Sequence, residues 1–141
     1  MPTSTLTTFY SLPENLCEKV HNLGSDSLVV ALTNSAPSRS NTVLANITQI
    51  SYTNCSSRAL TVSSSSQTTG TYKLIIADLT LTASGGDVGP FQYAVIYNDT
   101  ATNDELIGYY DYGSALTLHT GESLTLDFDG SSGIFSLAFS G

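Results

Sequence analysis

The stretch from Gly89 to Gly113 constrains the fold most, because both of its β-type runs are apolar on both faces. Side chains alternate between the two faces of a strand, so a strand with water on one side has one polar set. In the first run the two sets are Phe91, Tyr93, Val95 and Tyr97 against Ala94 and Ile96. In the second run they are Leu106, Gly108, Tyr110 and Tyr112 against Ile107 and Tyr109. Each face needs a cover, and we expect the core on one side and an N-terminal helix or a second subunit on the other.

Runs of β-forming residues recur roughly every ten residues after Gly24, separated by Gly, Asn, Asp, Ser or Pro. The predicted strands are Ser27–Thr33, Val43–Tyr52, Ala59–Ser63, Tyr72–Thr82, Phe91–Asn98, Leu106–Tyr112, Ala115–His119, Ser123–Phe128 and Ile134–Phe139. Short strands at this spacing are typical of a sandwich. We predict an all-β, jelly-roll-like antiparallel β-sandwich of about eight strands, with a simpler Greek-key sandwich as the alternative.

A short helix is expected before the first strand. Ser11 and Glu14 have the spacing of a capping box, Pro13 suits a first helical turn, and apolar residues then recur every three or four positions. These features predict a helix from Leu12 to Asn22. The chain of 141 residues has the size of one domain. We therefore expect a flexible N-terminal arm at residues 1–10 and a single domain at 11–141.

The charge balance narrows the classes of partner. Four Lys and Arg residues stand against twelve Asp and Glu residues, which gives a net charge of −8. Such a chain is repelled by a nucleic-acid backbone and favours a basic partner. A membrane-spanning helix needs about 18 consecutive apolar residues, and the sequence has no such run. We expect neither a nucleic acid nor a membrane as partner.

Two acidic clusters, Asn98–Glu105 and Asp127–Asp129, carry oxygen ligands of the kind that bind calcium. Neither has a full ligand set, and Asn-Asp and Asp-Gly pairs are common in tight turns. We interpret both clusters as turns and expect no metal and no cofactor.

Catalytic motifs are not recognised in the sequence. His21 and His119 have no nucleophile or metal-binding pattern around them, so we expect a protein that is not an enzyme. Cys17 and Cys55 are the only cysteines, and two free thiols are favoured over one disulfide.

Tyrosine is the remaining signal, with eight Tyr and no Trp in the chain. Tyr is favoured at protein interfaces because its ring buries a large area while its hydroxyl stays hydrogen-bonded. The doubly apolar strands and the N-terminal arm supply the candidate interface residues, which are Thr7, Thr8, Phe9, Tyr10, Ile96, Ile107, Tyr109 and Tyr112.

Four segments of the sequence, Glu18–Pro37, Gly70–Leu74, Gly89–Gly113 and Gly121–Phe128, resemble a family of small proteins from tailed bacteriophages. Members of that family are encoded among head genes and include jelly-roll cement or decoration proteins of the capsid. The resemblance covers most of the chain, from the predicted helix to the predicted last strand. It implies no catalytic residue, because the family has no catalytic motif.

The resemblance implies a structural virion protein on the capsid exterior that binds the outer surface of the shell and stabilises it. The implied partners are the major capsid protein and a second or third copy of this chain, as a homodimer or homotrimer. An alternative is a virion carbohydrate-binding or adhesion module that stacks sugars on exposed tyrosines, for which the candidates are Tyr97, Tyr109, Tyr110 and Tyr112.

Overall fold

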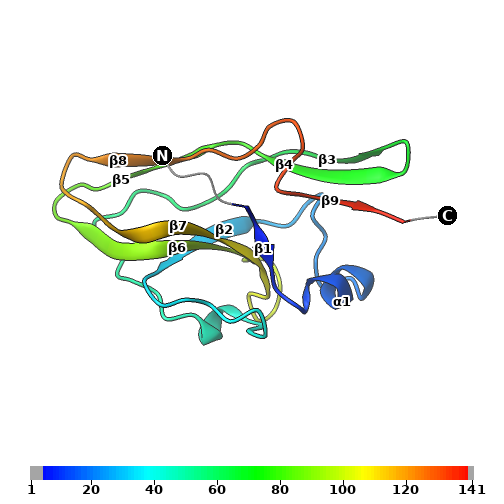
Figure 1. The fold of residues 1–141 in the computed structure, drawn as a ribbon, viewed down its shortest axis with the longest axis horizontal. Helices are drawn as coiled ribbons and strands as arrows, with labels where there is room; N and C mark the ends of the chain where they lie inside the picture. Colours follow the sequence, from blue (N-terminus) through cyan, green and yellow to red (C-terminus); the bar gives the residue numbers. More distant parts are fainter. Residues whose placement is uncertain (1–4, 140–141) are drawn as a thin grey trace.

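The structure is a computed structural model that describes residues 5–139. Its antiparallel strands form two layers (Figure 1). One layer is a four-stranded sheet in the order β1-β7-β6-β2, and the other holds a three-stranded sheet, β3-β4-β9, and a two-stranded sheet, β5-β8. The bounds are β1 Thr7–Thr8, α1 Leu12–Cys17, β2 Leu28–Thr33, η1 Leu44–Asn46, β3 Val62–Thr68, β4 Thr71–Ile76, β5 Leu79–Thr82, β6 Val88–Asn98, β7 Leu106–Leu118, β8 Ser123–Leu126 and β9 Phe135–Ala138.

The predicted fold class, an all-β antiparallel sandwich with a short N-terminal helix, is confirmed. Two predicted boundaries were wrong in an informative way. The run Tyr72–Thr82 is two strands, because the chain breaks at Ala77 and Asp78 between β4 and β5. The predicted strands Leu106–Tyr112 and Ala115–His119 are one strand, β7, with an irregular stretch at 112–115.

The predicted strand Val43–Tyr52 was also wrong. This segment contains the one-turn helix η1 and irregular chain. The Asn46 Oδ1 atom accepts the backbone N–H groups of Thr42 and Val43, and the only β-pairing of this segment within the described residues is an isolated bridge from Val43 to Glu105. Conversely, residues 64–66, which follow the predicted strand Ala59–Ser63, lie inside β3.

Helix α1 is shorter than the predicted Leu12–Asn22. It ends at Cys17, and Lys19 then adopts a left-handed backbone with φ of 66°. Pro13 lies in the first turn, as predicted, but the capping box does not form, because Ser11 makes no side-chain cap bond.

Residues 5–10, predicted as part of a flexible arm, belong to the sandwich. Thr7 and Thr8 form β1 and pair with Tyr109 and Gly108 of β7. Phe9 is fully buried. Residues 1–4 of the predicted arm lie outside the described residues.

The space between the layers holds the main core, but the predicted faces of β6 need one correction. Ala94 and Ile96 face this core, as predicted for one set. Phe91 joins them instead of sharing a face with Val95 and Tyr97. The reason is a register shift between Phe91 and Tyr93, which breaks the simple alternation.

β7 has a comparable break at its start. Tyr97 pairs with Leu106 and Ile96 pairs with Gly108, which leaves Ile107 as an extra residue. Ile107 therefore turns into the core between the layers, while Leu106 packs on the other face of the sheet.

That other face is covered by the chain itself. Phe9 and Ile47 pack on Ala31, Val95 and Leu106, and the segment after β2 passes below the sheet (Figure 1). Both expected covers, the N-terminal helix and a second subunit, were therefore wrong.

Helix α1 packs elsewhere. Its residue Leu12 joins Leu23, Leu28 and Ile107 at one end of the core between the layers. The helix thus closes an end of the sandwich and does not cover the outer face of the four-stranded sheet.

Candidate interaction site

The structure removes three of the eight predicted interface residues from the surface. Phe9, Ile96 and Ile107 are each 0 % exposed, because the domain's own core and outer cover enclose them. These three predictions are corrected: the apolar side chains stabilise the fold and offer no area to a partner.

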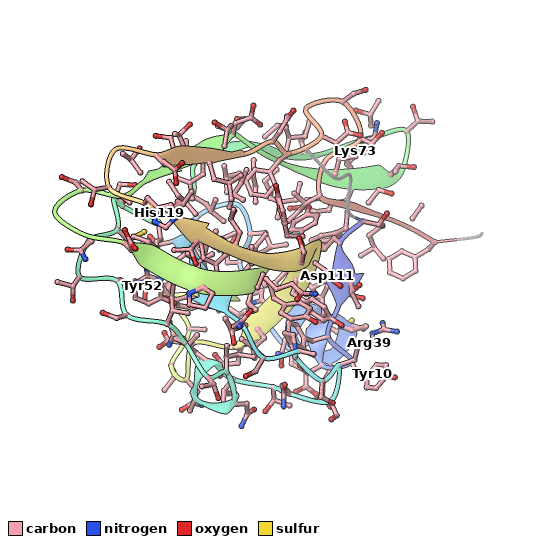
Figure 2. The ribbon with its side chains drawn as sticks, turned by 60° about the vertical axis from the view of Figure 1, so that its left-hand side comes forward. Tyr10, Arg39, Tyr52, Lys73, Asp111 and His119 are labelled. Carbon is pink, nitrogen blue, oxygen red and sulfur yellow. The ribbon has the colours of Figure 1, made fainter. Side chains whose placement is uncertain are left out.

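The other five predicted residues are spread over two regions. Thr7, Thr8 and Tyr109 are half-buried where β1 meets β7, and the Tyr109 ring lies 5.5 Å from that of Phe9. Tyr10 is 65 % exposed. The Arg39 guanidinium lies 4.6 Å from the centre of the Tyr10 ring, and the two side chains lie together at the molecular surface (Figure 2).

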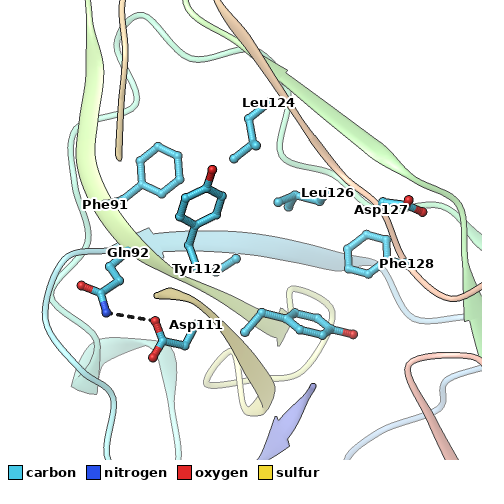
Figure 3. Close-up of a pocket in the computed structure, with 10 residues that line it drawn as sticks. Phe91, Gln92, Asp111, Tyr112, Leu124, Leu126, Asp127 and Phe128 are labelled. Carbon is cyan, nitrogen blue, oxygen red and sulfur yellow. Dashed lines mark hydrogen bonds between the residues drawn. The ribbon is translucent and has the colours of Figure 1, made fainter. Parts of the chain in front are cut away.

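Tyr112, the eighth residue, lies at a pocket between the layers, on the side where β7 and β8 lie. Aromatic and aliphatic side chains form its walls, among them Phe91, Tyr112, Leu124 and Phe128 (Figure 3). The cavity has a volume of about 90 Å³. The irregular stretch 112–115, which faces a single residue of β6, is what places Tyr112 at this position.

Polar groups lie at the sides of the pocket. The Gln92 amide Nε2 donates to Asp111 Oδ1 at 2.9 Å, and the Gly113 N–H donates to the same oxygen at 2.8 Å (Figure 3). Asp127 also lines the pocket and is exposed. The pocket therefore has apolar walls with the Asp111 carboxylate at one side, while the Asp127 carboxylate points away from the cavity (Figure 3).

Tyr110 forms another wall and packs on Phe128, with ring centres 5.8 Å apart. Burial, together with the Asp129 carboxylate, raises the pKa of Tyr110 to about 12. The phenol therefore stays neutral at ordinary pH, and the wall that it forms adds no charge.

The pocket volume limits what can enter. An engineered protein cavity of about 150 Å³ holds a benzene molecule. A cavity of about 90 Å³ is smaller, so it suits one aliphatic side chain better than a sugar ring. The arrangement can bind a protruding side chain of a partner protein.

The two acidic clusters make turns, as predicted. Asn98 Oδ1 accepts the N–H groups of Thr100 and Ala101, and Asp129 Oδ1 accepts those of Ser131 and Ser132. Among residues 5–139, no group of three or more His, Cys, Asp or Glu side chains is placed to hold a metal ion.

His119, Cys17 and Cys55 do not line the pocket. His119 Nδ1 is 3.1 Å from Asp87 Oδ2 in an exposed pair (Figure 2 labels His119). Cys17 and Cys55 are free thiols, which confirms that prediction. Burial raises the pKa of the Cys55 thiol, which makes it less reactive.

Two surface residues escaped the sequence-based predictions. Leu137 is 41 % exposed and Phe139 is 85 % exposed. The signal that could have found them is the Phe135-x-Leu137-x-Phe139 alternation, which places three large apolar residues on one face of the last strand.

Comparisons of this chain with protein-family models, with curated protein sequences and with solved structures found no match. None of the helices within residues 5–139 has the length and apolar character needed to cross a membrane.

Proposed function

We propose that this protein is a non-enzymatic structural protein of a tailed-phage virion, which binds the outer surface of the capsid and stabilises the shell. The observation that carries the proposal is the pocket between β7 and β8, whose size suits one side chain of a protein partner. The resemblance of four sequence segments to capsid cement and decoration proteins supports the major capsid protein as the partner.

The energetics of such a pocket fit a protein that binds a shell in many copies. Burial of one Leu- or Met-sized side chain contributes roughly 1.5–3 kcal/mol. One such contact is weak alone, but several contacts on a repeating lattice reinforce one another through avidity. A side-chain pocket of this kind is a natural centre for a small interface.

The charges around the pocket indicate the character of the capsid surface. Asp111 and Asp127 lie at the pocket of a chain whose net charge is −8. A basic or neutral patch on the capsid complements them, and an acidic patch opposes them. We expect a capsid side chain that is apolar, or a Lys whose stem enters while its ammonium reaches a carboxylate.

The packing of the four-stranded sheet suits a protein that resists outward pressure. Its inner face packs on the second layer, and its outer face packs on Phe9 and the 34–59 segment. A sheet enclosed on both faces deforms little when it is loaded, because close-packed interiors have low compressibility.

A binding assay with purified capsids that lack this protein tests the proposal. The wild-type protein should cosediment with the capsids and raise the temperature at which they release DNA. The variant Asp127→Lys should weaken the affinity about tenfold, because it puts a positive charge at a pocket that is expected to face a basic or neutral patch of the capsid. The matched variant Asp99→Lys makes the same change of charge at another place, the β6–β7 turn. It should bind like the wild type. Failure of the wild-type protein to bind would reject the function.

The alternative, a carbohydrate-binding module, rests on the aromatic rings of Tyr110 and Tyr112 beside the Gln92 amide. Tyr97 cannot serve as a stacking platform, because it is only 5 % exposed. The small pocket volume also weakens this alternative. Glycan-array hits that disappear in Tyr112→Ala would favour it over capsid binding.

A further inference from the structure

The edges of the sheets differ in how they are protected from pairing with another chain. β1 pairs with part of β7. Beyond β1, the Gly113 N–H donates to the Asp111 carboxylate, so this N–H is not open to another strand. The side of β2 that faces away from β6 bonds to Arg58. The Arg58 carbonyl accepts the Val30 N–H, and the Arg58 guanidinium donates to the Val30 carbonyl. β3 carries an irregularity just after Val62. Each of these edges is covered, capped or distorted.

The remaining edge of the second layer is formed by β8 and β9. β8 lies between the carboxylates of Glu122 and Asp127, which discourage a further strand. β9 pairs with β4 on one side, and within residues 5–139 no strand pairs with its other side. It contains no charge, no proline and no irregularity in its register. β9 is thus the least protected edge of the described sheets.

β9 also carries an apolar row that leaves the core. Phe135 and Leu137 pair with Leu74 and Tyr72, and they face the same side because they are two residues apart. Phe139, one residue beyond β9, continues the alternation. Exposure rises along the row, from half-buried Phe135 to 41 % at Leu137 and 85 % at Phe139. Two of the three exposed large hydrophobic residues in the described chain lie here.

The charges near β9 indicate what can approach it. The chain has four Lys and Arg residues, and two of them lie near β9. Lys73 of β4 pairs with Ser136. Lys19 and Leu137 line one open groove at the surface. These two basic residues reduce the repulsion that a second copy of a chain with a net charge of −8 meets at β9.

We propose that β9 is a self-association surface, at which two copies pair their β9 strands antiparallel around a two-fold axis. The two three-stranded sheets then form one continuous sheet, and each Phe139 covers the apolar row of its partner. This inference deepens the proposed function by naming the surface that makes the homo-oligomer. It also selects a dimer, because one edge paired with itself has two-fold symmetry.

The backbone geometry supplies a specific reporter. The Ile134 N–H donates to the Leu74 carbonyl at 2.9 Å, so it points toward β4. The Leu74 carbonyl therefore faces β9, so the pairs Leu74–Phe135 and Tyr72–Leu137 exchange backbone bonds, and the N–H groups of Ser136 and Ala138 point to the free edge. They should exchange with solvent in the monomer and become protected in the dimer.

Light scattering during size-exclusion chromatography of the purified full chain, without capsids, tests the inference. We expect a dimer, and we expect Phe139→Glu to weaken dimerisation by at least about tenfold through lost apolar burial and added repulsion. Tyr10→Glu, which changes another exposed aromatic residue in the same way, should leave the dimer intact.

Hydrogen exchange decides whether β9 is the contact. Protection of the Ser136 amide should increase with protein concentration. A monomer at about 100 μM, or a trimer, would overturn the inference. So would a dimer that is insensitive to Phe139→Glu and leaves the Ser136 amide unprotected. None of these results bears on capsid binding, which is measured separately, so the two proposals can fail independently.

Discussion

His21 is buried beside the turn that follows β6, and its surroundings favour the neutral ring. Asn98 Nδ2 lies 3.0 Å from His21 Nδ1, and an amide N–H₂ can only donate, so Nδ1 accepts. The other oxygen and nitrogen bonds of Asn98 hold its amide in this orientation. Protonation of Nδ1 therefore breaks a buried hydrogen bond.

This arrangement predicts a pH dependence of stability. Burial lowers the pKa of His21 from 6.5, although the nearby carboxylates of Glu105 and Asp26 oppose the shift. The unfolded chain then takes up a proton at a higher pH than the folded chain. Stability is complete above about pH 6.5 and falls as the pH drops below it. Urea unfolding at pH 7.5 and 5.5 should show this loss, and His21→Gln should reduce it. An equal loss in both proteins would exclude His21 as the cause.

Two glycines provide a second test at the residue scale. Gly70 and Gly133 both have a left-handed backbone, with φ of 80° and 77°. A Cβ atom at Gly70 meets open space, whereas at Gly133 it collides with the backbone of Leu74. Gly70→Ala should cost about 1–2 kcal/mol of unfolding free energy, and Gly133→Ala should cost clearly more. Equal thermal denaturation midpoints for the two variants would contradict the packing of the 129–134 turn on β4.

At the scale of elements, the sequence predicted the strands whose pattern is local. β2, β6 and β8 lie within a few residues of their predicted positions. The faces of Phe91 and Ile107 could not be predicted, because each depends on a register shift between paired strands. A single-strand pattern contains no information on where its partner inserts extra residues.

The cover of the four-stranded sheet was missed for a related reason. Ile47 lies in the run Val43–Tyr52, which the sequence predicts as a strand, and Phe9 lies in a Thr-rich stretch that looks like an arm. Both become apolar covers only when the chain returns to the outer face of β6 and β7. The pocket at Tyr112 was likewise hidden, because the irregular stretch 112–115 creates it.

Neighbouring residues at the N-terminus test the assignment of this element. Phe9 is 0 % exposed, whereas Tyr10 is 65 % exposed. Phe9→Ala should lower the unfolding free energy by about 3–5 kcal/mol. Tyr10→Ala should lose only the contact with Arg39, about 0.5–1 kcal/mol. Chemical denaturation of both variants gives the comparison. A cost below about 1 kcal/mol for Phe9→Ala would mean that residues 5–10 are not part of the domain.

At the scale of the whole molecule, the chain completes its own sandwich. The double-sided apolar pattern of the 89–113 hairpin is satisfied within one copy, by the second layer on one side and by the 34–59 segment with Phe9 on the other. The two surfaces proposed for partners are the pocket lined by β6, β7 and β8 and the free edge of β9. Strands β8 and β9 lie at different places in the second layer (Figure 1).

A reconstruction of capsids with the bound protein, at a resolution that shows side chains, tests capsid binding most directly. We expect the protein on the outside of the shell, with one side chain of the major capsid protein inside the pocket lined by Tyr112, Leu124 and Phe128. Particles without the protein on their exterior, or a bound protein whose pocket faces solvent, would contradict the proposed function and its site.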